Sequence, residues 1–366
     1  MSTAPLEAHA NAPDSSNLAT HGGWPAVLSR ITAGEDLDPV LLRAAFSEIL
    51  RGDATSAQIA AFAIGMRTKG ESIAELSTVL STMEEFGVSV PLDDATKNTA
   101  ICTCGTGGDR SHSINVSTTA AFVVAGAGGV ICKHGGRAAS SAAGSADVLE
   151  ALGVALEITP EGIARCIREA GVGFCLAPRF HPALRHAAPT RRELGVATMF
   201  NFLGPLANPG HITRQLVGVS DPVMAPKMLG VLQARGAKHA IAVFGHDGLD
   251  ELTTTTTSTM LVLQDGLIRE HTVDPADFGI RRTTIDQLRG GLAADNARFL
   301  RAVLEGTSGP HRDIVLLNAA AGCVVAGLAD DLGRGFALAA DAVDSGRAVA
   351  ALDALIRVSQ EEAANV

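Results

Sequence analysis

Apolar residues follow helical spacing in the first quarter of the chain. Capping-box sequences, Thr55 with Gln58 and Ser72 with Glu75, precede two such runs, and Asp38-Pro39 combines an N-cap residue with a proline at the first helical position. The two runs place apolar side chains at i, i+3, i+4 and i+7: Ile59, Phe62, Ala63 and Met66, then Leu76, Val79, Leu80 and Met83. The segment from about residue 24 to 90 is therefore predicted to be entirely helical, with apolar faces that need a partner.

Beyond this segment, short β-rich runs alternate with helical patterns. Residues 160–170, which follow Thr159 as an N-cap, and roughly 225–235 are predicted helices, and two or three helices are expected between about 296 and 360. The threonine run 253–257 is predicted to be an edge strand. The other predicted strands are 98–104, 128–133, 154–158, 172–176, 215–219, 238–244 and 259–264. This alternation predicts an α/β fold whose central sheet is mostly parallel, with helices on both faces.

The two patterns divide the chain into a small and a large domain. Residues 24–95 are predicted to form an all-helical N-terminal domain, and residues 96–366 an α/β domain. Residues 1–23 are rich in Ala, Ser, Pro and Asn and lack the apolar core of a secretory signal, so we expect a disordered N-terminal tail.

Composition narrows the classes of function. Apolar residues make up 46% and charged residues 19% of the chain, and the longest apolar runs are too short to span a bilayer. A net charge of −10, without a long run of Lys or Arg, disfavours nucleic-acid binding. The six cysteines include no C-x-x-C pair, which argues against a zinc site or a disulfide framework, and Cys102 and Cys104 are interpreted as packing residues. We expect a cytoplasmic protein without a nucleic-acid or membrane partner.

Two glycine-rich turns follow predicted strands. The first, "CGTGGDRSHSINVST" (104–118), turns on three glycines and enters a predicted helix. The second, "KHGGRAASSAAGSAD" (133–147), adds the charges of Lys133 and Arg137 and leads to a helix near Ser145. Backbone N–H groups in such a turn, with a helix N-terminus behind them, bind anions. One such turn is often only a tight loop, but two hydroxyl-rich turns at strand-to-helix junctions favour a polyphosphate ligand.

Two further stretches carry charge. Asp250 and Glu251 are adjacent carboxylates after the strand 238–244, and such a pair is either solvated or holds a cation. Beside two phosphate-binding turns, Mg²⁺ is favoured. The predicted helix 185–195 carries His186, Arg191 and Arg192, and an apolar loop bent by Gly and Pro, "NFLGPLANP", follows it. An arginine beside such a loop can bind the carboxylate of an aromatic ligand.

These motifs together resemble one family. "GTGGD…NVST", "KHG-x-R…GSADVLEALG", "HPALRHAAPTRRELG…FNFLGPLANP" and "DGLDE" occur in the order and at the spacings of the anthranilate phosphoribosyltransferase family, over about residues 25–360. The resemblance implies the type III phosphoribosyltransferase fold, with part of the 185–210 region packed on the helical domain. It also implies homodimers formed through the helical domains.

The resemblance further implies roles for individual residues. Two Mg²⁺ ions would be held, one by Ser117 and Glu251 and the other by Asp250 with Glu251. Lys133 would neutralise the leaving group, and His134 would orient the acceptor amine or accept its proton, although a merely packed histidine remains an alternative. Anthranilate would contact Gly105, Gly136, Arg191 and Pro205. Phosphoribosyl pyrophosphate would be bound by Gly105, Gly108, Asp109, Ser113, Asn115, Val116, Ser117, Thr118, Lys133, His134, Gly135, Gly136, Arg137, Ala138, Ala139, Ser140, Ser141 and Ser145.

One position departs from the family pattern. The family's K-H-G-N-R reads K-H-G-G-R here, so Gly136 stands where an asparagine would touch the acceptor, and Ala138 and Ala142 also differ from common family residues. The expected reaction is transfer of the phosphoribosyl group to the amine of anthranilate, the second step of tryptophan biosynthesis from chorismate. The alternatives are transfer to a substituted anthranilate, a pyrimidine nucleoside phosphorylase-like activity that needs no Mg²⁺-pyrophosphate site, and a non-catalytic nucleic-acid-binding relative.

Overall fold

The computed structural model describes residues 17–138 and 142–365. These residues form two compact units. The helical unit comprises the described part of Met1–Ser89 together with Ala177–Pro209, and the α/β unit comprises that of Val90–Leu176 and Gly210–Val366. None of the helices in the described ranges is both long and apolar enough to cross a membrane.

The helical unit confirms the helices predicted from capping signals. Asp38 accepts a hydrogen bond from the Leu41 N–H at the start of α2, and both predicted capping boxes form, at α3 and at α4. The apolar residues predicted for α3 and α4 are buried. The elements of this unit are η2 (Leu18–His21), α1 (Gly23–Thr32), α2 (Pro39–Arg51), α3 (Ser56–Lys69), α4 (Ile73–Glu85), α9 (Ala177–Phe180), η3 (Pro182–His186), α10 (Ala188–Leu194) and α11 (Met199–Leu206).

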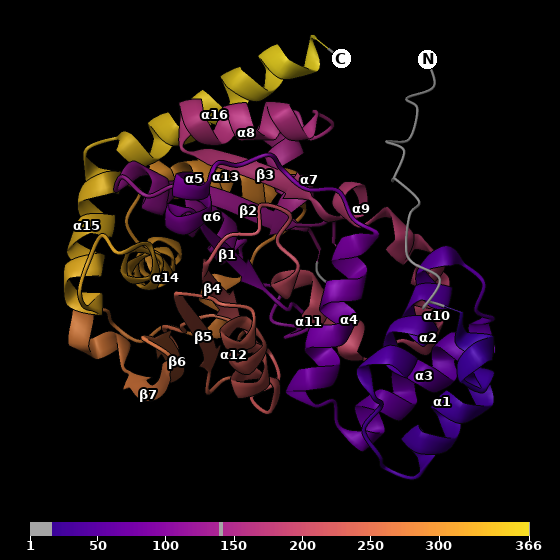
Figure 1. Cartoon of the computed structure of the whole chain (residues 1–366). Helices are drawn as coiled ribbons and strands as arrows, with labels where there is room; N and C mark the ends of the chain where they lie inside the picture. Colours follow the sequence, from indigo (N-terminus) through magenta and orange to yellow (C-terminus); the bar gives the residue numbers. More distant parts are fainter. Residues whose placement is uncertain (1–16, 139–141, 366) are drawn as a thin grey trace. The chain divides into compact units, whose positions relative to one another are not determined.

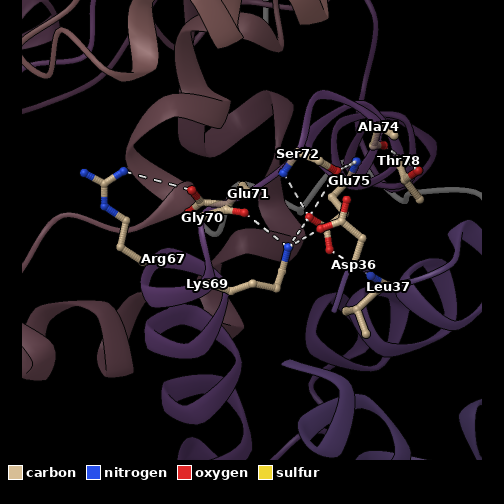
Figure 2. Close-up of polar contacts among 10 residues, drawn as sticks. All are labelled: Asp36, Leu37, Arg67, Lys69, Gly70, Glu71, Ser72, Ala74, Glu75 and Thr78. Atoms are coloured by element: carbon tan, nitrogen blue, oxygen red, sulfur yellow. Dashed lines mark hydrogen bonds and ion pairs between the residues drawn. The ribbon is translucent and has the colours of Figure 1, made fainter. Parts of the chain in front are cut away.

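A buried ion cluster fixes the connection between α3 and α4 (Figure 2). The Lys69 side chain, 3% exposed, contacts carboxylate oxygens of Glu75 at 2.8 Å and of Asp36 at 2.6 Å. The Glu75 carboxylate also accepts hydrogen bonds from the backbone N–H groups of Leu37 and Ser72, both at 2.9 Å. The cluster therefore holds the loop before α2 against the turn between α3 and α4.

The α/β unit is built on a seven-stranded sheet within the described residues (Figure 1). The strand order is β3-β2-β1-β4-β5-β6-β7. The strands β3, β2, β1, β4 and β5 are parallel to one another, β6 is antiparallel to β5, and β7 is antiparallel to β6. This confirms the predicted α/β fold with a mostly parallel sheet. The strands are β1 (Ile101–Gly105), β2 (Ile131–Gly135), β3 (Val172–Leu176), β4 (Arg214–Gly218), β5 (His239–Gly245), β6 (Ser258–Gln264) and β7 (Leu267–Val273).

Helices α6, α8, α14 and α16 pack with one another and with β1, β3 and β4, whereas α12 packs against β5 and β6. All six cysteines lie in the described residues, are buried and form no disulfide, Cys102 and Cys104 on β1 among them. The helices of this unit are α5 (Asp94–Thr99), α6 (Val116–Gly126), α7 (Ser145–Ala151), α8 (Pro160–Ala170), α12 (Met224–Ala234), η4 (Pro275–Phe278), η5 (Ile285–Leu288), α13 (Ala293–Leu304), α14 (Pro310–Ala326), α15 (Leu332–Asp344) and α16 (Arg347–Ala363).

Four predictions about elements were wrong. Residues 154–158 are not a strand, because their alternating apolar side chains are buried in the α7–α8 connection without a partner strand. The run 253–257 is not a strand either, since hydroxyls of Thr253 and Thr254 are fixed by side-chain partners instead of a ladder. The charged, exposed edge strand β7 was missed. Finally, four helices rather than two or three close the described chain.

Candidate active site

Both glycine-rich turns lie at the carboxyl ends of neighbouring strands. β1 ends at Gly105 and β2 at Gly135, and these strands are adjacent in the sheet. β1 pairs with β2 on one side and with β4 on the other, so the chain order reverses beside β1. In open α/β sheets, ligands bind at the carboxyl ends of the strands at such a switch point. The fold therefore places the predicted anion-binding turns where this architecture binds its ligands.

The first turn combines unusual backbone angles with the start of a helix. Gly107 and Gly108 have φ of 66° and 86°, and the non-glycine residues Arg110 and His112 have φ of 57° and 54°. Non-glycine residues adopt this left-handed region rarely, and such residues concentrate at ligand sites. The turn ends at α6, whose first three residues are the predicted ligand-binding residues Val116, Ser117 and Thr118.

The remaining predicted residues of this turn are engaged in local contacts. The Asp109 carboxylate accepts a hydrogen bond from the Ser111 hydroxyl at 2.7 Å. Ser113 forms an isolated antiparallel bridge with Arg289. Val116 is 2% exposed, so its side chain belongs to the core and only its backbone is suited to contact a ligand.

Asp147 of α7 closes the second turn. Its Oδ2 atom accepts hydrogen bonds from the N–H groups of Ala138 at 2.9 Å and Gly144 at 2.8 Å. Gly144 must be a glycine, because a side chain there would collide with the backbone of Ala138. The predicted ligand-binding residues Ala139, Ser140 and Ser141 lie outside the described residues.

The two turns are cross-linked by side chains. The Thr118 hydroxyl at the start of α6 donates to the Ser145 hydroxyl, the first residue of α7, at 2.8 Å. The Asn115 Nδ2 group donates to the carbonyl oxygen of Ala143 at 3.1 Å. Residues predicted from two separate motifs are therefore brought together in one place.

Arg137 is paired with carboxylates of α7. Its guanidinium contacts Glu150 at 2.5 Å and Asp147 at 3.2 Å, and its side chain is 49% exposed. The positive charge predicted for the second turn is thus balanced locally in the structure. Lys133, the other cation of this turn, forms no ion pair with a carboxylate among the described residues.

Lys133 lies inside the α/β unit, 2% exposed, on β2. Its Nζ group donates to the carbonyl oxygen of Thr103 and approaches the Ser117 hydroxyl at 3.4 Å. A buried ammonium at the start of α6 adds a full positive charge to the partial positive charge of the helix N-terminus. His134, the next residue, is 4% exposed, and its backbone N–H donates to the Cys102 sulfur at 3.3 Å.

The acidic pair lies across the ends of β1 and β4. Asp250 accepts a hydrogen bond from the Gly107 N–H at 2.8 Å, and Glu251 accepts one from the Ser117 N–H at 3.1 Å. Gly105 and Gly218 are register partners, and a side chain on either would collide with Asp250. The absence of side chains at these two positions lets the carboxylates reach the first turn.

Burial raises the pKa of both carboxylates. Asp250 and Glu251 are each 9% exposed. Burial, aided by the negative charge of Asp109, raises the pKa of Asp250 to about 7. Burial and the charge of Asp250 raise the pKa of Glu251 well above its usual value, although the nearby Lys133 opposes the shift. A cation bound between these two buried carboxylates would stabilise their ionised forms, so the pair is suited to bind one.

The predicted acceptor residues of the helical unit lie on α10 and α11. The Arg191 guanidinium stacks over the Phe200 ring at 5.3 Å from its centroid, and burial lowers the pKa of Arg191. No carboxylate among the described residues pairs with it. Pro205 is buried near the end of α11. His186 instead packs its ring against Gly52 at the end of α2, and Arg192 is exposed.

The second turn has open space at Gly136. A Cβ atom built there meets no heavy atom within 4 Å, whereas one at Gly135 would come within 3.0 Å of the Phe174 ring. A side chain at Gly135 would therefore require a small shift of the Phe174 ring, whereas one at Gly136 begins in open space. A Cβ atom at Gly136 therefore requires no rearrangement of the described residues.

Several residues of the site were not predicted. Gly218 ends strand β4 as Gly105 ends β1, and a glycine at the end of a predicted strand is the signal that could have identified it. Asn318 of α14 holds Leu252, beside Glu251, by a pair of hydrogen bonds at 2.8 and 2.9 Å. Asn296 of α13 contacts Asn115 at 2.8 Å. No local pattern marks either asparagine, since each lies within an ordinary helical sequence.

Two family models cover most of the chain. Residues 25–87 match the model described as "Glycosyl transferase family, helical bundle domain". Residues 97–349 match the model described as "Glycosyl transferase family, a/b domain".

Relatives named anthranilate phosphoribosyltransferase match nearly the whole length. The chain is 47% identical to that of Salinispora arenicola (strain CNS-205) over 92% of this chain and 96% of the relative, and 48% identical to that of Mesorhizobium japonicum over 94% and 99%. The crystal structure of the Thermus thermophilus protein of this name has 35% identity and a TM-score of 0.83, over 91% of this chain and 99% of that chain. A Saccharomyces cerevisiae structure, described as a complex with PRPP and Mg, shares the fold at 24% identity and a TM-score of 0.83, over 94% and 99%.

Proposed function

Since the chain belongs to the anthranilate phosphoribosyltransferase family, we propose which of its residues carry the family's reaction. The enzyme transfers the phosphoribosyl group of 5-phosphoribosyl 1-pyrophosphate (PRPP) to the amine of anthranilate. The products are N-(5-phosphoribosyl)anthranilate and pyrophosphate, in a step of tryptophan biosynthesis.

The two glycine-rich turns bind PRPP in this proposal. Their N–H groups and the N-termini of α6 and α7 suit an anionic ligand, and the hydroxyls of Thr118 and Ser145 meet between them. Gly105, Gly108, Asp109, Ser113, Asn115 and the residues from Lys133 to Ser145 named above complete the PRPP site. Asp147 supports the second turn through its hydrogen bonds to Ala138 and Gly144, and Arg137, one of the proposed PRPP residues, pairs with Asp147 and Glu150.

The observation that carries the assignment is the pair of buried carboxylates beside these turns. Asp250 and Glu251 offer oxygen ligands of the kind that Mg²⁺ prefers, and their raised pKa values indicate that the chain alone supplies too little positive charge for them. We assign Mg²⁺ to Asp250, Glu251 and Ser117, with two ions as the expected number. When bound, Mg²⁺ neutralises negative charge on the pyrophosphate.

Lys133 supplies the fixed positive charge of the reaction. Pyrophosphate leaves C1 of the ribose as the amine attacks, and its negative charge grows in the transition state. Lys133 and the N-terminus of α6 are held in place before the substrate arrives, so they stabilise this charge without rearrangement. An aromatic amine needs little activation, and His134 is therefore assigned to orientation of the amine and not to an obligatory proton transfer.

Arg191 binds the anthranilate carboxylate in this proposal. Its guanidinium is partly desolvated on Phe200 and has no carboxylate partner among the described residues. A guanidinium in this state gains a charge-assisted hydrogen bond when a carboxylate arrives. In this proposal Pro205 contributes apolar surface for the aromatic ring. In the α/β unit, Asp250 occupies the space beside Gly105, and the open position is Gly136.

The test is a fluorescence assay. Purified protein is incubated with PRPP, Mg²⁺ and anthranilate, and the loss of anthranilate fluorescence is followed. Loss that requires all three components is expected. No loss, together with phosphorolysis of uridine or thymidine, contradicts the assignment.

Gly136 bears on which anthranilates are accepted. The open space at this position lacks the amide that the family's asparagine would offer, so we expect weaker anthranilate binding and greater tolerance of ring substituents. Gly136→Asn should lower the KM for anthranilate by up to about tenfold, the worth of one neutral hydrogen bond. The variant should also narrow the range of accepted analogues, and an unchanged KM and range would contradict this role.

A homodimer through the helical unit completes the proposal. Val40, Ile64 and Ile73 leave apolar surface exposed on α2, α3 and α4, at 50%, 36% and 41%. Sedimentation at low micromolar concentration should give about twice the chain mass, and Ile64→Glu should reduce it. A monomer in the unmodified protein would contradict the dimer.

A further inference from the structure

Asn296, near the start of α13, lies far from every motif of the proposed site in the sequence, yet it contacts the first turn. Its side chain is 3% exposed. Its Nδ2 group donates to the Oδ1 atom of Asn115 at 2.8 Å, and its Oδ1 atom accepts from the Gly291 N–H at 2.7 Å. Asn115 in turn donates to the Ala143 carbonyl of the second turn.

These contacts form one chain with a defined direction. The Gly291 N–H is only a donor, so it must face the oxygen of the Asn296 amide. This turns the Asn296 NH₂ group toward Asn115, and the Asn115 NH₂ group toward the Ala143 carbonyl. The backbone at Gly291 therefore fixes the orientation of two successive side-chain amides, the second of which contacts the second turn.

The segment before α13 also supports the first turn directly. The Ile114 N–H donates to the Leu288 carbonyl at 3.0 Å, and the Gly290 N–H donates to the His112 carbonyl at 2.8 Å. Gly290 is required by this arrangement, because a Cβ atom there would lie 2.5 Å from the Asn296 Oδ1 atom and 2.9 Å from the Ser113 carbonyl oxygen. The strained residues of the turn, including His112, are thus held from outside the turn.

We propose that Asn296 is a positioning residue for PRPP binding, which acts through Asn115 to set the distance between the two glycine-rich turns. The inference rests on the proposed PRPP site, and it adds a residue that neither the motifs nor the family resemblance assigned. Asn296 is buried behind Asn115, so its effect on the ligand is indirect. A ligand held by both turns depends on their separation, whereas one held by other residues does not.

Asn296→Asp is the sharpest variant. It keeps the volume of the side chain and the acceptor for the Gly291 N–H, but it places an oxygen against the Asn115 Oδ1 atom. We expect the KM and the dissociation constant for PRPP to rise by about tenfold or more, as for the loss of a buried hydrogen bond, while the KM for anthranilate changes little. If this variant does not fold, Asn296→Ala is used in its place.

A double-variant cycle tests whether Asn296 acts through Asn115. Asn115→Ala combined with Asn296→Ala should raise the KM for PRPP no further than Asn115→Ala alone. Ser359→Ala is the matched control, because it removes a buried hydrogen bond from the Ala155 N–H in the same unit but outside the turns. This control should lower the melting temperature without changing the KM for PRPP.

The outcomes separate this inference from the function it rests on. An inactive unmodified protein that binds no PRPP in calorimetry would overturn both. An active unmodified protein would overturn only the role of Asn296 if the Asn296 variants bind PRPP normally, or if the effects of the two substitutions add fully.

Discussion

Glu75 in the helical unit and Glu251 in the α/β unit are both almost completely buried, at 1% and 9% exposure. The Glu75 carboxylate meets the Lys69 ammonium at 2.8 Å and accepts backbone hydrogen bonds from Leu37 and Ser72 (Figure 2). Among the described residues, Glu251 has one backbone donor, Ser117, and a carboxylate neighbour, Asp250, instead of an ion-pair partner.

The difference separates a structural charge from a ligand-binding charge. Burial opposes the ionisation of Lys69, but hydrogen bonds and charges from Asp36 and Glu75 outweigh it and raise the pKa of Lys69. In the α/β unit, burial prevails and raises the pKa of both carboxylates. A buried charge that the chain neutralises itself holds elements together, whereas one left without compensation is suited to an external cation.

Neutralising the acidic pair should have the largest effect. Asp250→Asn with Glu251→Gln keeps the shape and the hydrogen-bond acceptors but removes the charge. We expect kcat/KM to fall by at least about 100-fold, since even groups that only support a metal ligand contribute roughly 10–100-fold. The melting temperature of the metal-free protein should stay unchanged or rise. Glu270→Gln, an exposed change on β7, is the control, and an equal loss of activity and stability would make the pair structural.

Removing Lys69 should act on stability instead. Lys69→Met leaves the Glu75 carboxylate buried without its ion-pair partner, which costs roughly 3–5 kcal/mol. Trp24, the single tryptophan, lies in the same unit, so its fluorescence during urea unfolding reports the loss. Arg30→Met, at a more exposed ion pair with Asp38 in the same unit, should cost less than about 1 kcal/mol. A wild-type unfolding midpoint in Lys69→Met would contradict the structural role of the cluster.

Arg191 and Lys69 are both cations of the helical unit. Lys69 pairs with two carboxylates, whereas Arg191 forms no ion pair among the described residues. Arg191→Ala should raise the KM for anthranilate by about 10–100-fold, the worth of a hydrogen bond between charged groups. The KM for PRPP and the melting temperature should change little. Steady-state kinetics with each substrate varied in turn makes the measurement, and equal effects on both KM values would place Arg191 outside the acceptor site.

The pH dependence of stability should differ between the two regions. The pKa of Asp250 is 3.8 as a reference value and about 7 in the folded, metal-free protein, so the folded state binds more protons between these values. The pKa of Glu251 is raised as well, so the free energy of unfolding should fall as pH rises from about 4 to about 7, by at most about 1.4 kcal/mol per pH unit for each of the two carboxylates. Urea unfolding at a series of pH values measures this slope against the double variant, which should lack it. Identical slopes in the two proteins would show that the carboxylates are already compensated.

The smallest effect is expected at the exposed edge of the ion cluster. Asp36 is 61% exposed and pairs with Lys69 at 2.6 Å. Asp36→Asn should cost less than about 1 kcal/mol, because solvent screens this partner. Urea unfolding makes the comparison, and a loss as large as that of Lys69→Met would mean that Asp36, and not Glu75, is the main partner of Lys69.

Features that depend on neighbouring residues were predictable from the sequence. The caps at Asp38, Thr55 and Ser72, the helix 160–170 and the strand-to-turn junctions at Gly105 and Gly135 each rest on contacts or steric limits within a few positions. The strand predicted over 154–158 was wrong because a strand also needs a partner strand, and alternating apolar residues within one segment do not supply one.

The helical and α/β patterns and the two glycine-rich turns could be read from the order of residues, because local hydrogen bonding and backbone sterics decide these features. The tertiary structure alone decided that Gly105 and Gly218 both lie beneath Asp250 and that Asn296 reaches Asn115. It also decided which buried charges lie beside an opposite charge in the described residues. Lys69 pairs with Glu75, whereas Asp250 forms no ion pair there. These relations join residues far apart in the chain, and their distances and burial exist only once the sheet and helices have packed.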